Sequence, residues 1–180
     1  FGIYFKLQSF VFMPVFGLNN GMVPIIAYNY GAGHKDRVIK TIKHSVAYGV
    51  GIMFVGLLAM HIFPAQLMRM FDAEESLIAI GAPALETISL SFVFAGFCIV
   101  AGSVFQALGN GVYSMIVSVA RQMCVLLPVA KLLSLSGEVT LIWWAFPIAE
   151  LASVLLTSYF LVRIYRKVIC HIGEPVVQDA

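Results

Sequence analysis

Two side chains of opposite charge, Arg121 and Glu150, stand in long apolar stretches with no other charged residue near them. Each lies nine residues into its stretch, which is a depth of about 14 Å in an α-helix. The two depths are measured from opposite faces of a hydrocarbon core about 30 Å thick, so they nearly coincide. An unpaired charge at that depth costs at least about 2.5–3.5 kcal/mol. We therefore predict an intramembrane ion pair, which is either purely structural or takes part in coupling or substrate binding.

A third charge within an apolar stretch is Glu86, three residues after Pro83. If Pro83 begins a helix, the Glu86 carboxylate lies in the first turn, where the helix dipole stabilises a negative charge. An acid beside a partly hydrated cavity can also bind and release a proton or a cation. The residues leave both interpretations of Glu86 open.

Sequence patterns of catalytic sites are absent. No HExxH, GxSxG or phosphate-loop pattern occurs anywhere in the chain. The three cysteines (Cys98, Cys124 and Cys170) stand singly and are not paired with histidines, unlike the cysteines of a metal site or a disulfide framework. We predict that the protein is not an enzyme and has no catalytic residue, no bound metal and no cofactor.

The composition identifies the environment that positions these side chains. Of the 180 residues, 61% are hydrophobic and only 11% are charged, and the mean hydropathy is +0.94. A soluble domain carries about 25% charged residues, so this chain cannot cover a globular core with polar surface. The net charge of +2 supplies no basic stripe for phosphates, which argues against nucleic acid as a partner. The sequence predicts an all-α polytopic membrane protein whose surroundings are the lipid bilayer.

The charged residues divide the apolar sequence into five predicted transmembrane helices. A span needs about 20 apolar residues, and turn residues such as Gly109-Asn110-Gly111 separate two of the stretches. The predicted spans are 8–30, 45–63, 83–108, 112–133 and 141–164. Residues 170–180 form a predicted polar tail after the helical lobe of residues 1–169.

Lysine and arginine are distributed unequally between the two ends of these helices. Seven lie in the connection after the first span or after the last span, and three lie at the opposite end. Cytoplasmic loops carry the excess of Lys and Arg, so the C-terminus is predicted to be cytoplasmic. The first span then enters from outside, and the chain begins with Phe1 rather than Met. We expect a piece of a longer protein that lacks the helix before this span.

Prolines and glycines inside the spans indicate helices that bend. Proline within a helix removes one hydrogen bond and costs about 3 kcal/mol unless the freed carbonyl finds another donor. A GxxxG step lets another backbone approach closely. Recurring kinks are typical of a membrane protein that changes shape, although a packing kink without that role stays an alternative. The residues concerned are Pro14, Gly17, Gly21 and Pro24 in the first span, Pro128 in the fourth and Pro147 in the fifth.

Four segments of the chain together resemble one membrane-protein family. Residues 14–33 read PxxGLxxGxxPIIAYNYGAG, residues 105–111 read FQALGNG, residues 121–128 begin RQ and end LP, and residues 144–150 read WAFPIAE. In this order they closely resemble the MATE (multidrug and toxin extrusion) transporters, and in particular their bacterial drug-efflux branch. The resemblance reaches to about residue 169 and matches helices 8–12 of the family's twelve.

The resemblance implies a C-terminal lobe whose N-terminal partner lobe is missing, in a bacterial cytoplasmic membrane. The whole transporter would export small cationic or amphipathic drugs in exchange for inward H⁺ or Na⁺, the coupling ion. Such sites lie at the interface of the two halves. The residues implied as candidate drug contacts, on the first and third spans, are Met13, Phe16, Asn20, Phe94 and Gln106.

The chain departs from the family at one position that matters for coupling. Several branches carry a carboxylate about ten residues before the segment that corresponds here to Phe105-Gln106, whereas this chain has Phe94-Ala95-Gly96. Coupling would then depend on an acid in the family's first helix, outside this chain. A flippase for lipid-linked precursors from the same superfamily and a non-transporting membrane scaffold subunit are the alternative functions.

Overall fold

The computed structural model describes residues 2–71, 73–135 and 137–173, and within these ranges the chain is helical with short turns and no strand. Its α-helices are α1 (Gly2–Gly31), α2 (Lys35–Ile62), α3 (Pro64–Arg69), α4 (Glu75–Ser89), α5 (Phe92–Ala107), α6 (Gly111–Val119), α7 (Leu127–Ser134), α8 (Val139–Ile142) and α9 (Ala145–Lys167). A π-helical segment, η1 (Ala120–Leu126), joins α6 to α7, and a 3₁₀ turn, η2 (Ile169–His171), follows α9.

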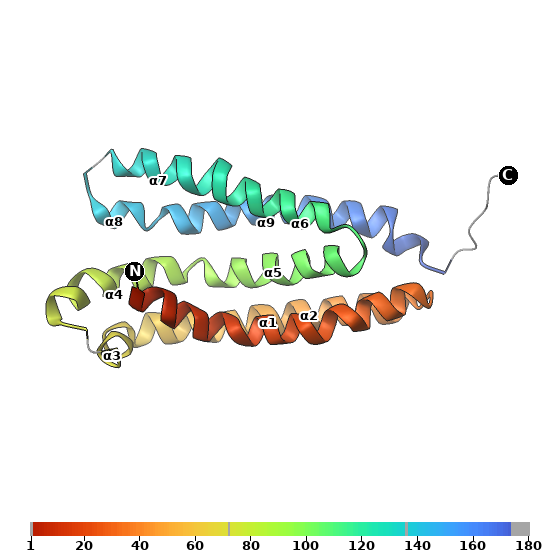
Figure 1. Cartoon of the computed structure of the whole chain (residues 1–180), viewed down its shortest axis with the longest axis horizontal. Helices are drawn as coiled ribbons and strands as arrows, with labels where there is room; N and C mark the ends of the chain where they lie inside the picture. Colours follow the sequence, from red (N-terminus) through yellow and green to blue (C-terminus); the bar gives the residue numbers. More distant parts are fainter. Residues whose placement is uncertain (1, 72, 136, 174–180) are drawn as a thin grey trace.

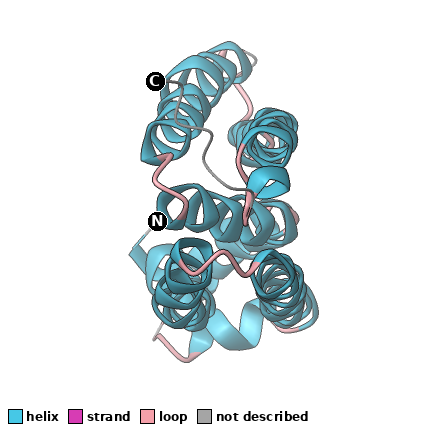
Figure 2. Cartoon of the chain, turned by 90° about the vertical axis from the view of Figure 1, so that its right-hand side faces the viewer, coloured by secondary structure: helices cyan, strands magenta, loops and turns pink. Residues whose placement is uncertain are grey.

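The long helices run along one axis and reverse direction at each connection (Figure 1). Helices α1 and α2 form one side of the bundle, α5 lies in the middle, and the α6–α7 and α8–α9 hairpin forms the other side. Figure 2 views the same helices nearly end-on. Helix α5 contacts α1, α2, α6 and α9, so it is the central element against which both sides pack.

Five membrane crossings fit this bundle, as the sequence predicts. Four helical stretches in the described residues are long and apolar enough to cross a bilayer: Gly2–Gly31, Lys35–Ile62, Gly111–Ser134 and Thr140–His171. The fifth crossing is the bent pair α4–α5. Helix α2 begins ten residues before its predicted span. At 1.5 Å per residue, its 28 residues extend beyond the hydrocarbon core, so its charged first turns remain in a polar region.

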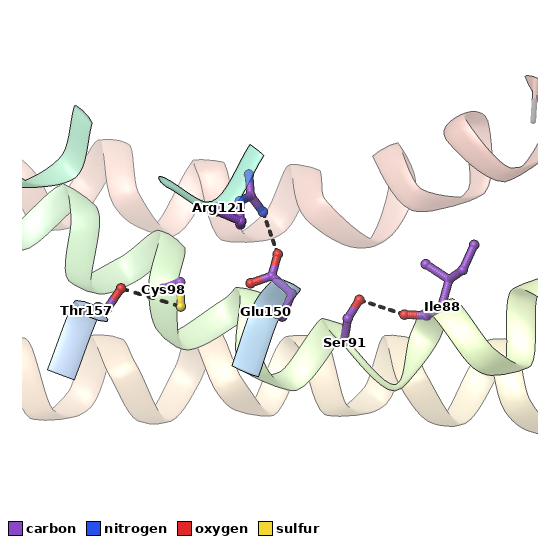
Figure 3. Close-up of polar contacts among 6 residues, drawn as sticks. All are labelled: Ile88, Ser91, Cys98, Arg121, Glu150 and Thr157. Atoms are coloured by element: carbon purple, nitrogen blue, oxygen red, sulfur yellow. Dashed lines mark hydrogen bonds and ion pairs between the residues drawn. The ribbon is translucent and has the colours of Figure 1, made fainter. Parts of the chain in front are cut away.

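The predicted single helix 83–108 is wrong, because α4 and α5 meet at an angle of 49°. Ser91 lies at the bend, and both its backbone N–H (3.0 Å) and its Oγ hydroxyl (2.6 Å) donate to the carbonyl oxygen of Ile88 (Figure 3). Ser89 Oγ likewise donates to the carbonyl oxygen of Glu86, at 2.9 Å. Serine hydroxyls that bond to backbone carbonyls compete with the helical ladder and bend helices.

Helices α2 and α5 make the closest backbone approach, at Gly49 and Gly96. A Cβ on Gly96 would lie 3.0 Å from the carbonyl oxygen of Gly49 and 2.7 Å from Cγ of Met53. The prediction that Gly17 and Gly21 supply the close approach is wrong within this chain, since a Cβ at either position would have no atom within 4 Å. The glycines that let helices pack here belong to the second and third spans.

The loop between α1 and α2 is tied to the chain end after α9. Lys35 Nζ donates to the carbonyl oxygen of Cys170 at 2.7 Å, and a Cβ on Gly173 would lie 3.1 Å from the carbonyl oxygen of Gly33. Ile169 and Ile172 are buried, so the predicted polar tail begins with residues that pack on the bundle. Residues 174–180 of that tail lie outside the described residues.

Candidate functional site

The structure brings Arg121 and Glu150 together across the interface between η1 and α9. Arg121 Nη1 donates to Glu150 Oε1 at 2.5 Å, and Figure 3 shows the two side chains pointing toward each other. The Glu150 side chain is 8% exposed, whereas that of Arg121 is 39% exposed. The pairing expected from the depths of the two residues is therefore present, and its role in coupling or substrate binding stays a prediction.

Arg121 lies in a π-helical segment that the sequence analysis did not foresee. The segment spans Ala120–Leu126, and the N–H of Leu127 donates to the carbonyl of Gln122, five residues earlier. Pro128 follows as the second residue of α7. Proline has no N–H to give to the carbonyl four residues earlier, and this was the available signal for an altered ladder. Single π-helical turns occur frequently at functional sites.

Glu150 is the sixth residue of α9, two turns from its start. Pro147 lies in the first turn of that helix, where a missing N–H costs little. The expectation that Pro147 frees the carbonyl of Trp143 inside a helix is wrong, because the N–H of Phe146 donates to that carbonyl at 3.3 Å. The chain turns between α8 and α9 here, and this turn sets the direction in which α9 presents Glu150.

A cleft of about 510 Å³ opens between α1, α5, α6–η1 and α9, and we call it the polar cleft. Three of the predicted drug contacts, Phe16, Asn20 and Gln106, line it, as do Pro24 and Arg121. The volume lies within the range of about 300–1,000 Å³ typical of small-molecule sites. The described residues thus provide a cleft in which residues from distant parts of the sequence face one space.

Polar groups line this cleft although it lies within an apolar bundle. Gln106 Nε2 donates to Ser114 Oγ at 3.2 Å, and Thr157 Oγ1 donates to Cys98 Sγ at 3.7 Å (Figure 3). Buried polar atoms normally have a hydrogen-bond partner. Two buried acceptors of the cleft, Asn19 Oδ1 and Ser153 Oγ, have none among the described residues. The remaining polar residues of the lining are Ser103 and Ser118.

A second, smaller cavity of about 220 Å³ lies on the other side of the ion pair. Glu150, Tyr4, Gln8 and Gln122 line it, and Arg121 lines both this cavity and the polar cleft. Glu150 Oε2 is buried and has no hydrogen-bond partner in the described part of the chain. The ion pair therefore separates two cavities, with the carboxylate toward the smaller one.

Three other predicted site residues lie away from the polar cleft. Met13 is 68% exposed on α1 and Phe94 is half-buried on α5, and neither lines the cleft or the second cavity. Glu86 is in the last turn of α4, not the first, because α4 begins at Glu75 and contains Pro83 in its interior. The helix dipole is unfavourable to a carboxylate at that end, so the stabilising role predicted for Glu86 is wrong.

The described residues contain no group of three histidine, cysteine or acidic side chains placed to hold a metal ion. The chemistry that the site offers is therefore that of hydrogen bonding and of one ion pair.

Comparison with known proteins identifies the kind of molecule that this bundle belongs to. Residues 1–132 match the family model described as MatE. The chain belongs to the MATE family. Members of this family are membrane transporters rather than enzymes.

The MATE relatives similar to this chain include export proteins from two staphylococci. The Multidrug export protein MepA of Staphylococcus haemolyticus is 25% identical over 167 residues, which are 93% of this chain and 36% of MepA. MepA of Staphylococcus aureus (strain bovine RF122 / ET3-1) is 27% identical over 151 residues, which are 83% of this chain and 33% of that protein. This chain thus spans about a third of the length of the curated relatives it matches.

Two solved MATE structures share the arrangement of helices. The multidrug transporter DinF-BH, solved in complex with a drug, superposes with a TM-score of 0.83 at 32% identity, covering 92% of this chain and 37% of that one. An inward-facing multidrug resistance transporter of the MOP superfamily superposes with a TM-score of 0.79 at 14% identity, over 91% of this chain and 39% of that one. The second likeness shows the fold alone.

Proposed function

We propose that this chain is the C-terminal lobe of a secondary active multidrug efflux transporter that exchanges cationic amphipathic compounds for H⁺ or Na⁺. Family membership and the names of the export-protein relatives support the transport activity. The share of those relatives that the chain spans supports a second, N-terminal lobe as its partner. Secondary transporters bind their cargo near the bilayer midplane between two such halves and alternate between inward- and outward-facing states.

The observation that carries the proposal is the polar cleft inside an apolar, membrane-spanning bundle. Phe16 supplies an apolar aromatic face, while Asn20 and Gln106 supply hydrogen-bond donors and acceptors in the same space. A site with mostly apolar walls and a few polar groups suits amphipathic molecules of varied shape. We therefore assign Phe16, Asn20 and Gln106 as the drug contacts of this lobe.

The ion-coupling acid of the transporter lies in the missing lobe in this proposal. Glu86 lines neither the polar cleft nor the second cavity, and residues 94–96 carry no acid. Glu150 is occupied by Arg121. An acid in a partly hydrated cavity can bind either a proton or a cation, so both ions remain candidates for the exchange.

The proposed location is a bacterial cytoplasmic membrane with the C-terminus in the cytoplasm. Seven Lys and Arg residues lie between α1 and α2 or near the end of α9, at one end of the bundle (Figure 1). Only three lie toward the opposite end, and the excess marks the cytoplasmic side.

The test is drug export by the full-length transporter that contains this chain. Cells that express it should resist cationic dyes, and collapse of the proton or sodium gradient should abolish that resistance. Separate ionophores for H⁺ and Na⁺ identify the coupling ion. Resistance that persists after both gradients are collapsed would contradict antiport, and export of a lipid-linked precursor in place of dyes would favour the flippase alternative. A matched control is a Leu155→Ala variant, because Leu155 is 74% exposed and lines neither cavity.

A further inference from the structure

We infer that the polar cleft binds the anionic group of its cargo through Arg121, so that the transporter accepts amphipathic compounds bearing a carboxylate beside their positive charge. The inference rests on the proposed function, because it names a substrate class for that same cleft.

The charge of the cleft lining favours an anion. Among the described residues that line the cleft, Arg121 is the only one with a charged side chain, and no carboxylate is among them. A bare cation in this cleft meets one guanidinium and several neutral dipoles, so nothing in this lobe stabilises its charge. The carboxylate of a zwitterion meets a counter-charge here, while its positive group is left for the acid of the other lobe.

Arg121 retains hydrogen-bonding capacity for such a group. A guanidinium has five N–H donors in one plane. Glu150 accepts from one of the two terminal nitrogens, and in the described part of the chain it is the only residue bonded to Arg121. The side chain is 39% exposed, so its remaining donors are accessible. A planar fork of donors matches the two oxygens of a carboxylate better than a lysine ammonium does.

The ion pair also has a direction. Glu150 lines only the second cavity, whereas Arg121 reaches the polar cleft. A carboxylate in the cleft therefore lies nearer to the guanidinium than to the Glu150 carboxylate. Because Coulomb energy falls with distance, attraction by Arg121 exceeds repulsion by Glu150.

Neutral donors on the same face extend this anion-binding surface. Ser114 and Ser118, two turns and one turn before Arg121, line the same cleft, and residues three or four apart lie on one side of a helix. Their hydroxyls can donate to a carboxylate oxygen. The α6–η1 wall of the cleft thus presents a guanidinium and hydroxyls to one space.

A matched pair of dyes tests the inference in the full-length transporter. The probe is a rhodamine ethyl ester with a fixed positive charge, and hydrolysis of the ester gives its free acid, which adds one carboxylate and removes two carbons. Export from cells or inside-out vesicles loaded to equal dye concentration gives a ratio of free-acid to ester export. We expect the wild type to export both dyes.

Two double variants then change the charge without leaving Glu150 unpaired. Arg121→Gln with Glu150→Gln removes both charges, and Arg121→Glu with Glu150→Arg keeps the pair and reverses its direction. We expect each to lower the free-acid to ester ratio about ten-fold, the effect of losing a hydrogen bond to a charged group. If neither variant reaches the membrane, Arg121→Lys keeps the charge beside Glu150 but loses the planar fork, and we expect a ratio about three-fold lower.

Each result bears on one conclusion. A wild type that exports the ester but excludes the free acid overturns the inference and leaves the proposed function standing. A ratio unchanged in the variants that reach the membrane also overturns it, since a purely structural ion pair would affect both dyes alike. Failure of the wild type to export either dye overturns the proposed function itself.

Discussion

Replacing Arg121 with glutamine removes the guanidinium from Glu150 and leaves a carboxylate with an 8% exposed side chain. Replacing Glu150 with glutamine instead leaves an arginine that is 39% exposed and faces the polar cleft. The two single substitutions delete the same contact from opposite sides. The structure therefore predicts that they differ in cost, with Arg121→Gln the more damaging.

The magnitudes follow from what each substitution leaves behind. Breaking a buried ion pair by removing one partner costs about 3–5 kcal/mol, and we expect about 3 kcal/mol for Arg121→Gln because the neighbouring cavity gives Glu150 some relief. For Glu150→Gln we expect about 1 kcal/mol, typical of an ion pair that is accessible to water. The double variant leaves no unpaired charge, so it should also cost about 1 kcal/mol, well below the sum of the single losses.

The assay is the free energy of unfolding of the full-length transporter, measured by denaturant titration in detergent micelles or bicelles for all four members of the cycle. Met123→Leu serves as the control, since Met123 lies in the same π-helical segment and is 64% exposed. Losses that add across the cycle would refute the ion pair as a stabilising unit. Equal losses from the two single variants would refute the assignment of the buried end to Glu150.

Three further predictions concern backbone geometry and the tie at the chain end. Gly96→Ala should destabilise the protein by about 1–3 kcal/mol through overpacking against α2, whereas Gly17→Ala should be neutral or stabilising because its Cβ meets open space; denaturant midpoints of the two variants in the full transporter compare them, and equal losses would contradict the packing. Gly109 has φ +77°, so Gly109→Ala should cost about 1–2 kcal/mol by the same titration, and an unchanged midpoint would contradict the left-handed turn. Lys35→Met should release the backbone around Cys170 and raise the reaction rate of that thiol with a maleimide, with Lys35→Arg as the control; an unchanged rate would contradict the tie.

The sequence was sufficient for the ion pair and for the number of crossings because both depend on depth in a bilayer. Charge is so costly in hydrocarbon that Arg121 and Glu150 had few other arrangements available. Runs of apolar residues near 20 long likewise leave little freedom in the count of spans. In this chain, these two constraints act on single segments and need no knowledge of how helices pack.

Features that depend on hydrogen-bond competition or on rotation about a helix axis were missed. The bend between α4 and α5 arises from Ser89 and Ser91, and these serines read as ordinary members of an apolar run. Glycine spacing at Gly17 and Gly21 matches GxxxG, yet the close approach occurs at Gly49 and Gly96, because which face of a helix meets a neighbour is decided by the whole bundle. The serine pair was the signal that could have predicted the bend.

The tie between Lys35 and the carbonyl of Cys170 joins residues 135 positions apart, and this separation has a consequence for biosynthesis. At about 5–20 residues per second, the ribosome needs about 7–27 s to make the intervening chain. During that interval the loop after the first helix stands without its last partner, and only arrival of the final span completes it. A chain that stops early, or whose last helix inserts in the wrong orientation, leaves this lysine and the nearby Gly33 uncovered. The tie is therefore a late checkpoint of correct insertion, made only after all five crossings have been synthesised.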